Sequence, residues 1–95
     1  MRWNNIPYIK QQDRKKLNIF IDNLVACLNE LGEDKLAGSL NYIISTLLGK
    51  LWLKKQRYVR INELMGVLEC VKQEFYRRIA VPYEEYKKRI EGDIY

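Results

Sequence analysis

The sequence contains no histidine among its 95 residues, and only two cysteines and two prolines. Without imidazole, the Ser-His and Cys-His nucleophile pairs are excluded, together with the commonest nitrogen ligands of protein metals. Cys27 and Cys70 both fall within helical patterns beside apolar positions, so we expect reduced, packed thiols and no disulfide framework. The sequence therefore predicts no metal site, no cofactor and no catalytic nucleophile.

Closely spaced carboxylates and phosphate-binding loops are also scarce. The acidic pairs Glu84 with Glu85 and Glu69 with Glu74 stand one and five residues apart, and helical neighbours at these spacings do not converge. There is no Gly-rich phosphate loop, internal repeat or low-complexity tract. These absences argue against an enzyme and favour a protein that binds without catalysis.

Long apolar runs are missing, although apolar residues make up 47% of the chain. No segment approaches the 18 or so apolar residues of a membrane span, and the N-terminus lacks a signal-peptide core. We expect a soluble, cytoplasmic protein of one domain, residues 1–95. Lys and Arg number 17 against 12 Asp and Glu, a net charge of +5 that favours an anionic partner without defining one.

Apolar positions recur every three or four residues and predict an all-α fold. We expect an arm over 1–12, a three-helix bundle over 13–81 with helices near 13–31, 34–53 and 60–80, and a short helix and tail over 82–95. Asp13 and Asp34 are candidate N-caps, Gly32 and Gly92 are candidate helix ends, and Pro82 should stop or bend the third helix. The residues expected to be among the most buried are Leu24, Leu28, Ile44, Leu47, Leu68, Val71 and Phe75.

Both the second and the third helix carry a polar stripe beside the apolar one. The third helix presents Asn62, Gly66, Glu69, Gln73 and Tyr76, with Arg77 beside them, and the second presents Gly38, Asn41, Tyr42, Ser45 and Gly49. A carboxylate, an amide, a phenol and a guanidinium on one face suit ligand recognition better than a plain solvated face. Each of these residues also has a structural interpretation, such as hydrogen bonding across a helix interface or, for Arg77, pairing with Glu74 or Gln73.

Small size and two faces per helix predict self-association as a symmetric dimer or tetramer, because one protomer of this length buries only about 60 to 65% of its unfolded surface. Two other interaction modes stay open. The basic segment 54–60, which surrounds Tyr58, is typical of a solvated turn but also suits nucleic-acid binding. Trp52, Leu53 and nearby apolar surface would suit a protein partner.

A resemblance emerges from five segments in a fixed order. They are PYIKQ at 7–11, LGEDKLAGSLNYII at 31–44, GVLECVKQEFYRR at 66–78, PYE at 82–84 and GDIY at 92–95. The segments resemble a family of small phage proteins, and that family is similar to the phage anti-CBASS sponges. Those sponges are small oligomers that sequester cyclic dinucleotide signals and so blunt bacterial immunity.

The resemblance implies a homo-oligomer in the host bacterial cytoplasm that binds a ligand such as 3′,3′-cGAMP without cleaving it. Such a ligand carries two phosphates and two flat bases, and its receptor needs cations, aromatic faces and groups that read base edges. The expected contact set is Asn41, Tyr42, Glu69, Gln73, Tyr76 and Arg77. In this interpretation binding of nucleic acid or of a host protein is the alternative, with nucleic acid the less favoured of the two.

Overall fold

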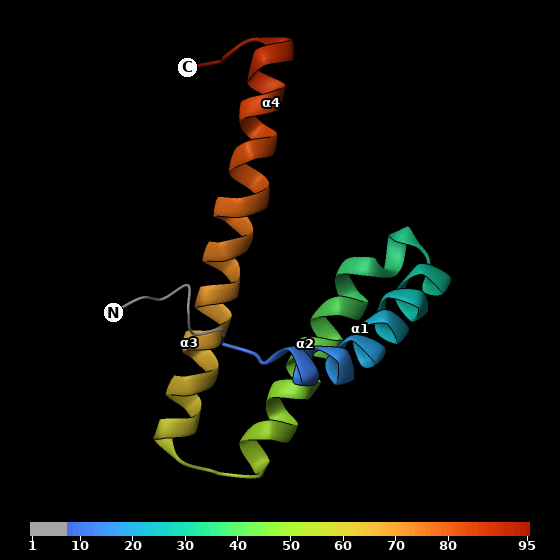
Figure 1. Ribbon diagram of the computed structural model, residues 1–95, viewed down its shortest axis with the longest axis vertical. Helices are drawn as coiled ribbons and strands as arrows, with labels where there is room; N and C mark the ends of the chain where they lie inside the picture. Colours follow the sequence, from blue (N-terminus) through green and yellow to red (C-terminus); the bar gives the residue numbers. More distant parts are fainter. Residues whose placement is uncertain (1–7) are drawn as a thin grey trace. The chain divides into compact units, whose positions relative to one another are not determined.

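The computed structural model describes residues 8–95, which are helical and contain no strand (Figure 1). Its elements are α1 (Gln11–Leu31), η2 (Glu33–Lys35), α2 (Leu36–Leu53), α3 (Tyr58–Phe75), η3 (Tyr76–Ala80) and α4 (Val81–Glu91). The prediction of an all-helical chain with three helices and a short fourth is confirmed. Most of the predicted 1–12 arm lies outside the described residues. The chain divides into two units, Met1–Thr46 and Leu47–Tyr95, and the boundary falls inside α2.

The first unit contains α1, η2 and the beginning of α2. The predicted caps are wrong: α1 begins two residues before Asp13, which lies in its first turn, and Asp34 lies within η2. Lys10 occupies the N-cap position of α1 without a side-chain cap, but Asp13 still places a negative charge near the positive end of the helix dipole. Gly32 ends α1 as predicted, with φ of 100° and ψ of 159°, a backbone conformation that is essentially restricted to glycine.

The second unit contains the end of α2 and one continuous helical segment formed by α3, η3 and α4 (Figure 1). The chain enters the predicted short helix without leaving the helical region, since Ala80 and Val81 both have αR dihedral angles. The sequence predicted that the helix stops or bends at Pro82, and it does not stop there. Pro82 has no N–H to donate to the carbonyl four residues earlier, and the turn before it is a π-helical segment in which Val81 N–H donates to Tyr76 O.

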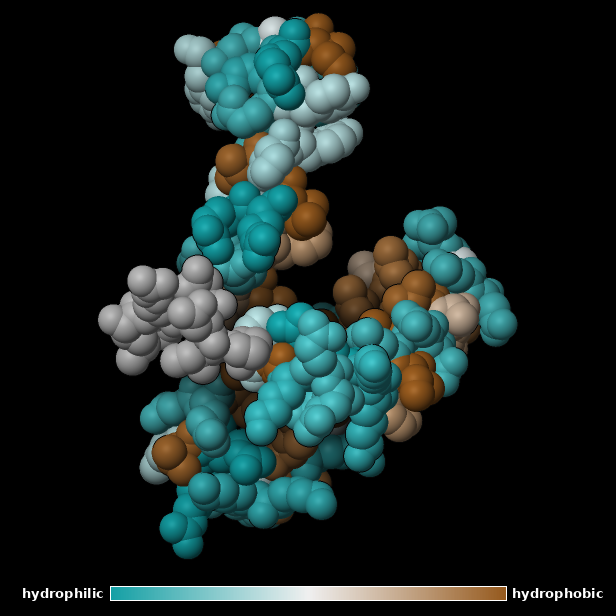
Figure 2. All heavy atoms as spheres, in the orientation of Figure 1, coloured by the Kyte–Doolittle hydropathy of each residue, from teal (hydrophilic) through white to brown (hydrophobic). Residues whose placement is uncertain are grey.

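No side chain among residues 8–95 is buried, so within these residues neither unit encloses a core of its own. Of the seven residues expected to be most buried, only Leu28 and Leu68 are partly covered, and the other five are exposed, from 38% for Ile44 to 64% for Phe75. Figure 2 shows apolar side chains as surface patches beside hydrophilic ones. The helical period predicts which face is apolar, but it does not say what covers that face.

Candidate functional site

A row of polar side chains runs along the second unit from α3 into η3. Gln73 Nε2 donates a hydrogen bond to Glu69 Oε1 at 3.0 Å, which fixes an amide and a carboxylate side by side one turn apart. Tyr76 follows on the same face and is 56% exposed, and Arg77 is next to it. All four side chains are exposed, and four of the six predicted contact residues therefore share one accessible face of one helical segment.

The charges at the end of this row do not balance. Arg77 pairs with Glu74, as the sequence suggested, and Arg78 approaches the other oxygen of the same carboxylate at 3.7 Å. Two guanidinium groups therefore share one carboxylate and leave a net positive charge. Since exposed ion pairs of this kind are worth only about 0 to 1 kcal/mol, a phosphate can compete with Glu74 for the Arg77 guanidinium. The arrangement provides an accessible anion contact beside the Glu69–Gln73 pair.

The other two predicted contacts, Asn41 and Tyr42, lie on α2 in the first unit. Ser45 Oγ donates to Asn41 Oδ1 at 3.1 Å within the same helix, so this pair does not bridge two helices. Tyr42 is 71% exposed and has no hydrogen bond among the described residues that would hold its hydroxyl. The predicted meeting of these two residues with the α3 row stays a prediction.

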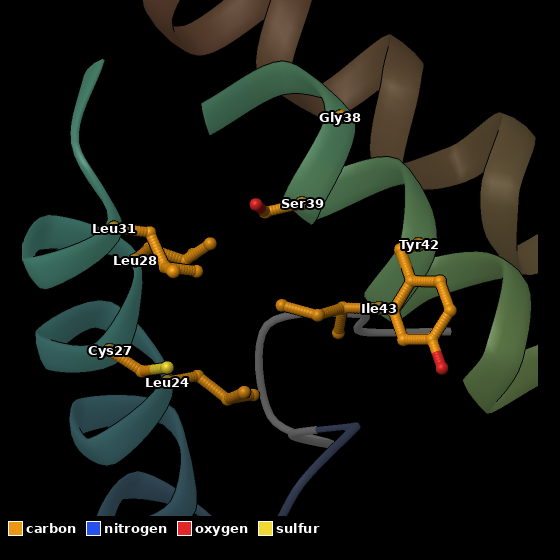
Figure 3. A pocket seen from close by; sticks show the side chains of 8 residues that line it. All are labelled: Leu24, Cys27, Leu28, Leu31, Gly38, Ser39, Tyr42 and Ile43. Atoms are coloured by element: carbon orange, nitrogen blue, oxygen red, sulfur yellow. The ribbon is translucent and has the colours of Figure 1, made fainter. Parts of the chain in front are cut away.

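An apolar hollow of about 390 Å³ lies between α1 and α2 in the first unit. Figure 3 shows Leu28 and Leu31 of α1 pointing toward α2 and Ile43 of α2 pointing toward α1. Its lining is completed by Leu24, Cys27, Gly38, Ser39 and Tyr42. The sequence alone did not predict this hollow, although the apolar period of α1 and the small residues of α2 are consistent with it.

The second unit has a hollow of its own, of about 290 Å³, where the end of α2 faces α3. Its lining is apolar and consists of Leu48, Gly49, Trp52, Ile61, Leu64, Met65 and Leu68. Trp52 Nε1 is shielded from solvent and has no hydrogen-bond acceptor among the described residues. An unpaired buried donor costs free energy, so a group that accepted this hydrogen bond would be favoured there.

The turn within the basic segment 54–60 is shorter than the sequence suggested, because α3 already begins at Tyr58. One of its four cations is engaged in structure: Arg60 Nη1 donates to Leu51 O at 2.8 Å, and Arg60 Nε donates to Glu63 Oε1 at 3.3 Å. Arg60 thereby ties the start of α3 to the end of α2. This contact supports the interpretation of the segment as a structural turn.

The C-terminal GDIY segment ends α4 through local contacts. Gly92 has φ of 89°, and its N–H donates to Lys88 O at 2.9 Å. The Asp93 carboxylate accepts a hydrogen bond from Tyr95 N–H at 3.0 Å and lies 3.7 Å from Lys88 Nζ, and these contacts lower the pKa of Asp93. The carboxylates of Glu85 and Asp93 raise the pKa of Lys88. The segment thus forms a C-terminal cap, while the Ile94 and Tyr95 side chains remain exposed.

Residues 8–95 offer neither a metal-binding cluster nor a membrane-spanning helix. No group of three or more Cys, Asp or Glu side chains is placed to hold a metal ion. No helix in this part of the chain is long and apolar enough to cross a membrane.

These features define, over residues 8–95, an all-helical protein with an exposed polar row on one helix and many exposed apolar side chains. The chain belongs to the family described as a domain of unknown function, DUF6899, whose family model matches residues 6–94. No curated protein and no solved structure matches the chain.

Proposed function

We propose that this protein binds a cyclic dinucleotide of the 3′,3′-cGAMP type and sequesters it without cleavage. In a phage-infected bacterium this would take place in the host cytoplasm and block CBASS-type defence. The observation that carries the proposal is the exposed row from Glu69 to Arg77, where four side chains with the chemistry of purine and phosphate recognition share one helical face. The resemblance of the sequence segments to the sponge proteins supports the same ligand class.

Each side chain of the row has a chemically suitable role. The Glu69 carboxylate accepts one hydrogen bond from Gln73 and retains lone pairs for the N1 and N2 donors of guanine. The Tyr76 ring is available for stacking on a base, and Arg77 is available for charge-assisted hydrogen bonds to phosphate. The row contains no histidine or cysteine, and its one carboxylate, Glu69, is assigned to base recognition, so the proposal is capture rather than hydrolysis.

A symmetric assembly would complete the site. A cyclic dinucleotide has two equivalent halves, so two copies of the chain can offer the same groups to each half across a two-fold axis. Asn41 and Tyr42 are proposed to join the contact set in that assembly. Burial of apolar surface would also drive assembly, because apolar side chains of both units are exposed in the single chain.

Isothermal titration calorimetry against cyclic dinucleotides, single-stranded oligonucleotides and duplex DNA tests the proposal. We expect heat only with a cyclic dinucleotide, weak dependence on salt, and intact ligand after heat denaturation of the protein. Degraded ligand would indicate an enzyme. Binding of DNA with a steep salt dependence would indicate a nucleic-acid-binding protein.

Arg77→Ala tests the site itself. Loss of a charge-assisted phosphate contact should weaken binding by about 1.5 to 3 kcal/mol, or roughly tenfold to more than a hundredfold. Arg78→Ala is the matched control, because Arg78 has the same charge, nearly the same exposure and the same partner, Glu74. Equal losses in the two variants would indicate a general charge effect, and no loss in Arg77→Ala would show that the contact set is wrong.

The Trp52 donor, which has no acceptor among residues 8–95, supports a second candidate function, binding of a host protein at the hollow of the second unit. A protein segment that offers a carbonyl oxygen together with an apolar side chain would satisfy Trp52 Nε1 and cover Met65 and Leu68. The calorimetric panel separates the two functions, because a protein-binding module gives no heat with any nucleotide.

A further inference from the structure

The apolar stripe of α1 follows the heptad spacing of helices that pair with one another. Its positions alternate by four and three residues and are Leu17, Ile21, Leu24, Leu28 and Leu31, hereafter the α1 seam. In heptad terms, Ile21 and Leu28 occupy a positions, and the three leucines at 17, 24 and 31 occupy d positions. Four of the five are 43 to 51% exposed, and Leu28 is partly covered. The seam is therefore available for pairing with another helix.

The two halves of the seam differ in their surroundings. The C-terminal half, from Leu24 to Leu31, lines the hollow of the first unit together with residues of α2. The N-terminal half, with Leu17 and Ile21, lines neither hollow, and Phe20 beside it is 60% exposed. Among residues 8–46, the unit thus has an apolar hollow at one end of α1 and exposed apolar side chains at the other end.

We propose that the hollow of the first unit is covered by the N-terminal half of α1 from a second copy of this chain, with the two α1 helices antiparallel. In the register that pairs a with d positions, Leu17 of one copy lies opposite Leu28 of the other, and Ile21 lies opposite Leu24. Because the relation is two-fold symmetric, the same contact forms twice and covers both hollows. Gly38 leaves room for the approaching helix, since a Cβ built there meets no atom within 4 Å.

The charges at the two ends of the first unit favour the antiparallel orientation of the two α1 helices. Residues 10–16 contain four cations, Lys10, Arg14, Lys15 and Lys16, and one carboxylate. Residues 30–35 contain three carboxylates, Glu30, Glu33 and Asp34, and one cation. The positions flanking the seam are uncharged, so these ends decide the orientation: antiparallel pairing joins basic ends to acidic ends, and parallel pairing would place like charges together.

The lining of the hollow argues against a nucleotide as its occupant. It is apolar except for the Ser39 hydroxyl, the Tyr42 hydroxyl and the Cys27 thiol, and no cation contributes to it. An anionic ligand would lose its hydration there without a charge partner. The interface rests on the proposed assembly but not on the identity of the ligand, so failure to bind a cyclic dinucleotide would leave it intact.

Disulfide trapping tests the arrangement in full-length protein. In a Cys70→Ser background, Phe20→Cys adds a thiol that the antiparallel register brings near the native Cys27 of the other copy. The two thiols within one chain are two helical turns apart, about 10 Å, and cannot form a bond with each other. We expect mild oxidation to convert most of this variant into a covalent dimer. Peptide mapping should identify a link between residues 20 and 27.

Ile19→Cys is the matched control, since Ile19 is 62% exposed but lies about 140° from Leu24 around the helix axis, away from the seam. Ile19→Cys should form no covalent dimer through residue 19 on oxidation. If the Cys70→Ser background crosslinks through Cys27 alone as fully as Phe20→Cys does, the antiparallel register is wrong. If light scattering of the background reports a monomer over a wide concentration range, the second copy is not the occupant, and a foreign helix takes its place.

Leu28→Asp gives an independent measurement. It should reduce the mass measured by light scattering to that of the monomer, whereas Ile19→Asp should not. If Leu28→Asp loses its helical circular dichroism, the variant is unfolded, and the disulfide-trapping experiment alone tests the interface. A folded Leu28→Asp variant that keeps the parent mass would show that another face holds the copies together.

Discussion

The π-helical segment η3 is the clearest case in which one residue explains a local structure, and Pro82→Ala tests the explanation. Proline in a helix interior costs about 3 kcal/mol relative to alanine, because it lacks a donor and its ring meets the carbonyl four residues earlier. The π turn, with Val81 N–H bonded to Tyr76 O, accommodates that ring and offsets part of the cost. We therefore expect Pro82→Ala to stabilise the protein by about 1 to 2 kcal/mol.

The variant should also restore α-helical hydrogen bonding, with the new N–H of residue 82 donating to Arg78 O. Urea unfolding followed by circular dichroism, at fixed protein concentration, measures the stability, and amide hydrogen exchange of residues 76–82 measures the hydrogen bonding. Tyr83→Ala is the control, because it introduces alanine next door without adding a donor, and it should change stability by less than about 0.5 kcal/mol. An unchanged midpoint in Pro82→Ala, or persistence of the π pattern, would refute the reasoning.

Two further predictions concern the ends of helices. Gly32→Ala should destabilise the protein by about 1 to 3 kcal/mol in urea unfolding, because its φ of 100° suits only glycine and the added Cβ would lie 3.1 Å from Asp34 Oδ1. Gly66→Ala, where a Cβ meets no atom within 4 Å, should instead gain up to about 1 kcal/mol, and a loss equal to that of Gly32→Ala would contradict the argument. The hydrogen bond of the Tyr95 amide to Asp93 should be present above the lowered pKa of Asp93 and be lost as pH falls through that pKa. The chemical shift of the Tyr95 amide in nuclear magnetic resonance should change with pH as Asp93 titrates. A chemical shift that stays constant into strong acid would contradict the prediction. A pH dependence that persists in Asp93→Asn would contradict it as well.

The helices were predictable because each shows the 3.6-residue apolar period over several turns. Gly32 and Gly92 were predictable as helix ends because a helix often ends at a residue with positive φ, which favours glycine. The predicted first residues of the helices were less accurate. Asp13 and Asp34 have the chemistry of caps, yet the helices begin elsewhere, because an acidic residue is also favoured inside a first turn. Pro82 signalled a disturbance without showing whether the chain breaks, bends or widens its turn.

Within the candidate site, only the contacts between side chains of the same helix were predictable from the sequence. The pairs Glu69–Gln73 and Glu74–Arg77 depend on spacing along a single helix, and the sequence indicated such local contacts. The meeting of Asn41 and Tyr42 with that row depends on how helices far apart in the chain are placed, which spacing does not encode. For the same reason, the period of α1 predicted its apolar face but not the hollow that the face forms with α2.

The exposed seam links assembly to ligand binding through simple energetics. Fully burying a large apolar side chain contributes about 1.5 to 3 kcal/mol, so covering the exposed half of each seam residue contributes about 1 kcal/mol, or about 10 kcal/mol over two copies. Association itself costs about 4 to 15 kcal/mol, which makes a dimer held by this seam alone weak. Additional stabilisation has to come from the second unit, where the apolar hollow beside Trp52 and the polar row ending at Arg77 are both exposed. A ligand that contacts two copies at once supplies such stabilisation, because any molecule that binds only the assembled state shifts the equilibrium toward it. Under the proposed function, the assembly would therefore be tightest when the cyclic dinucleotide is bound.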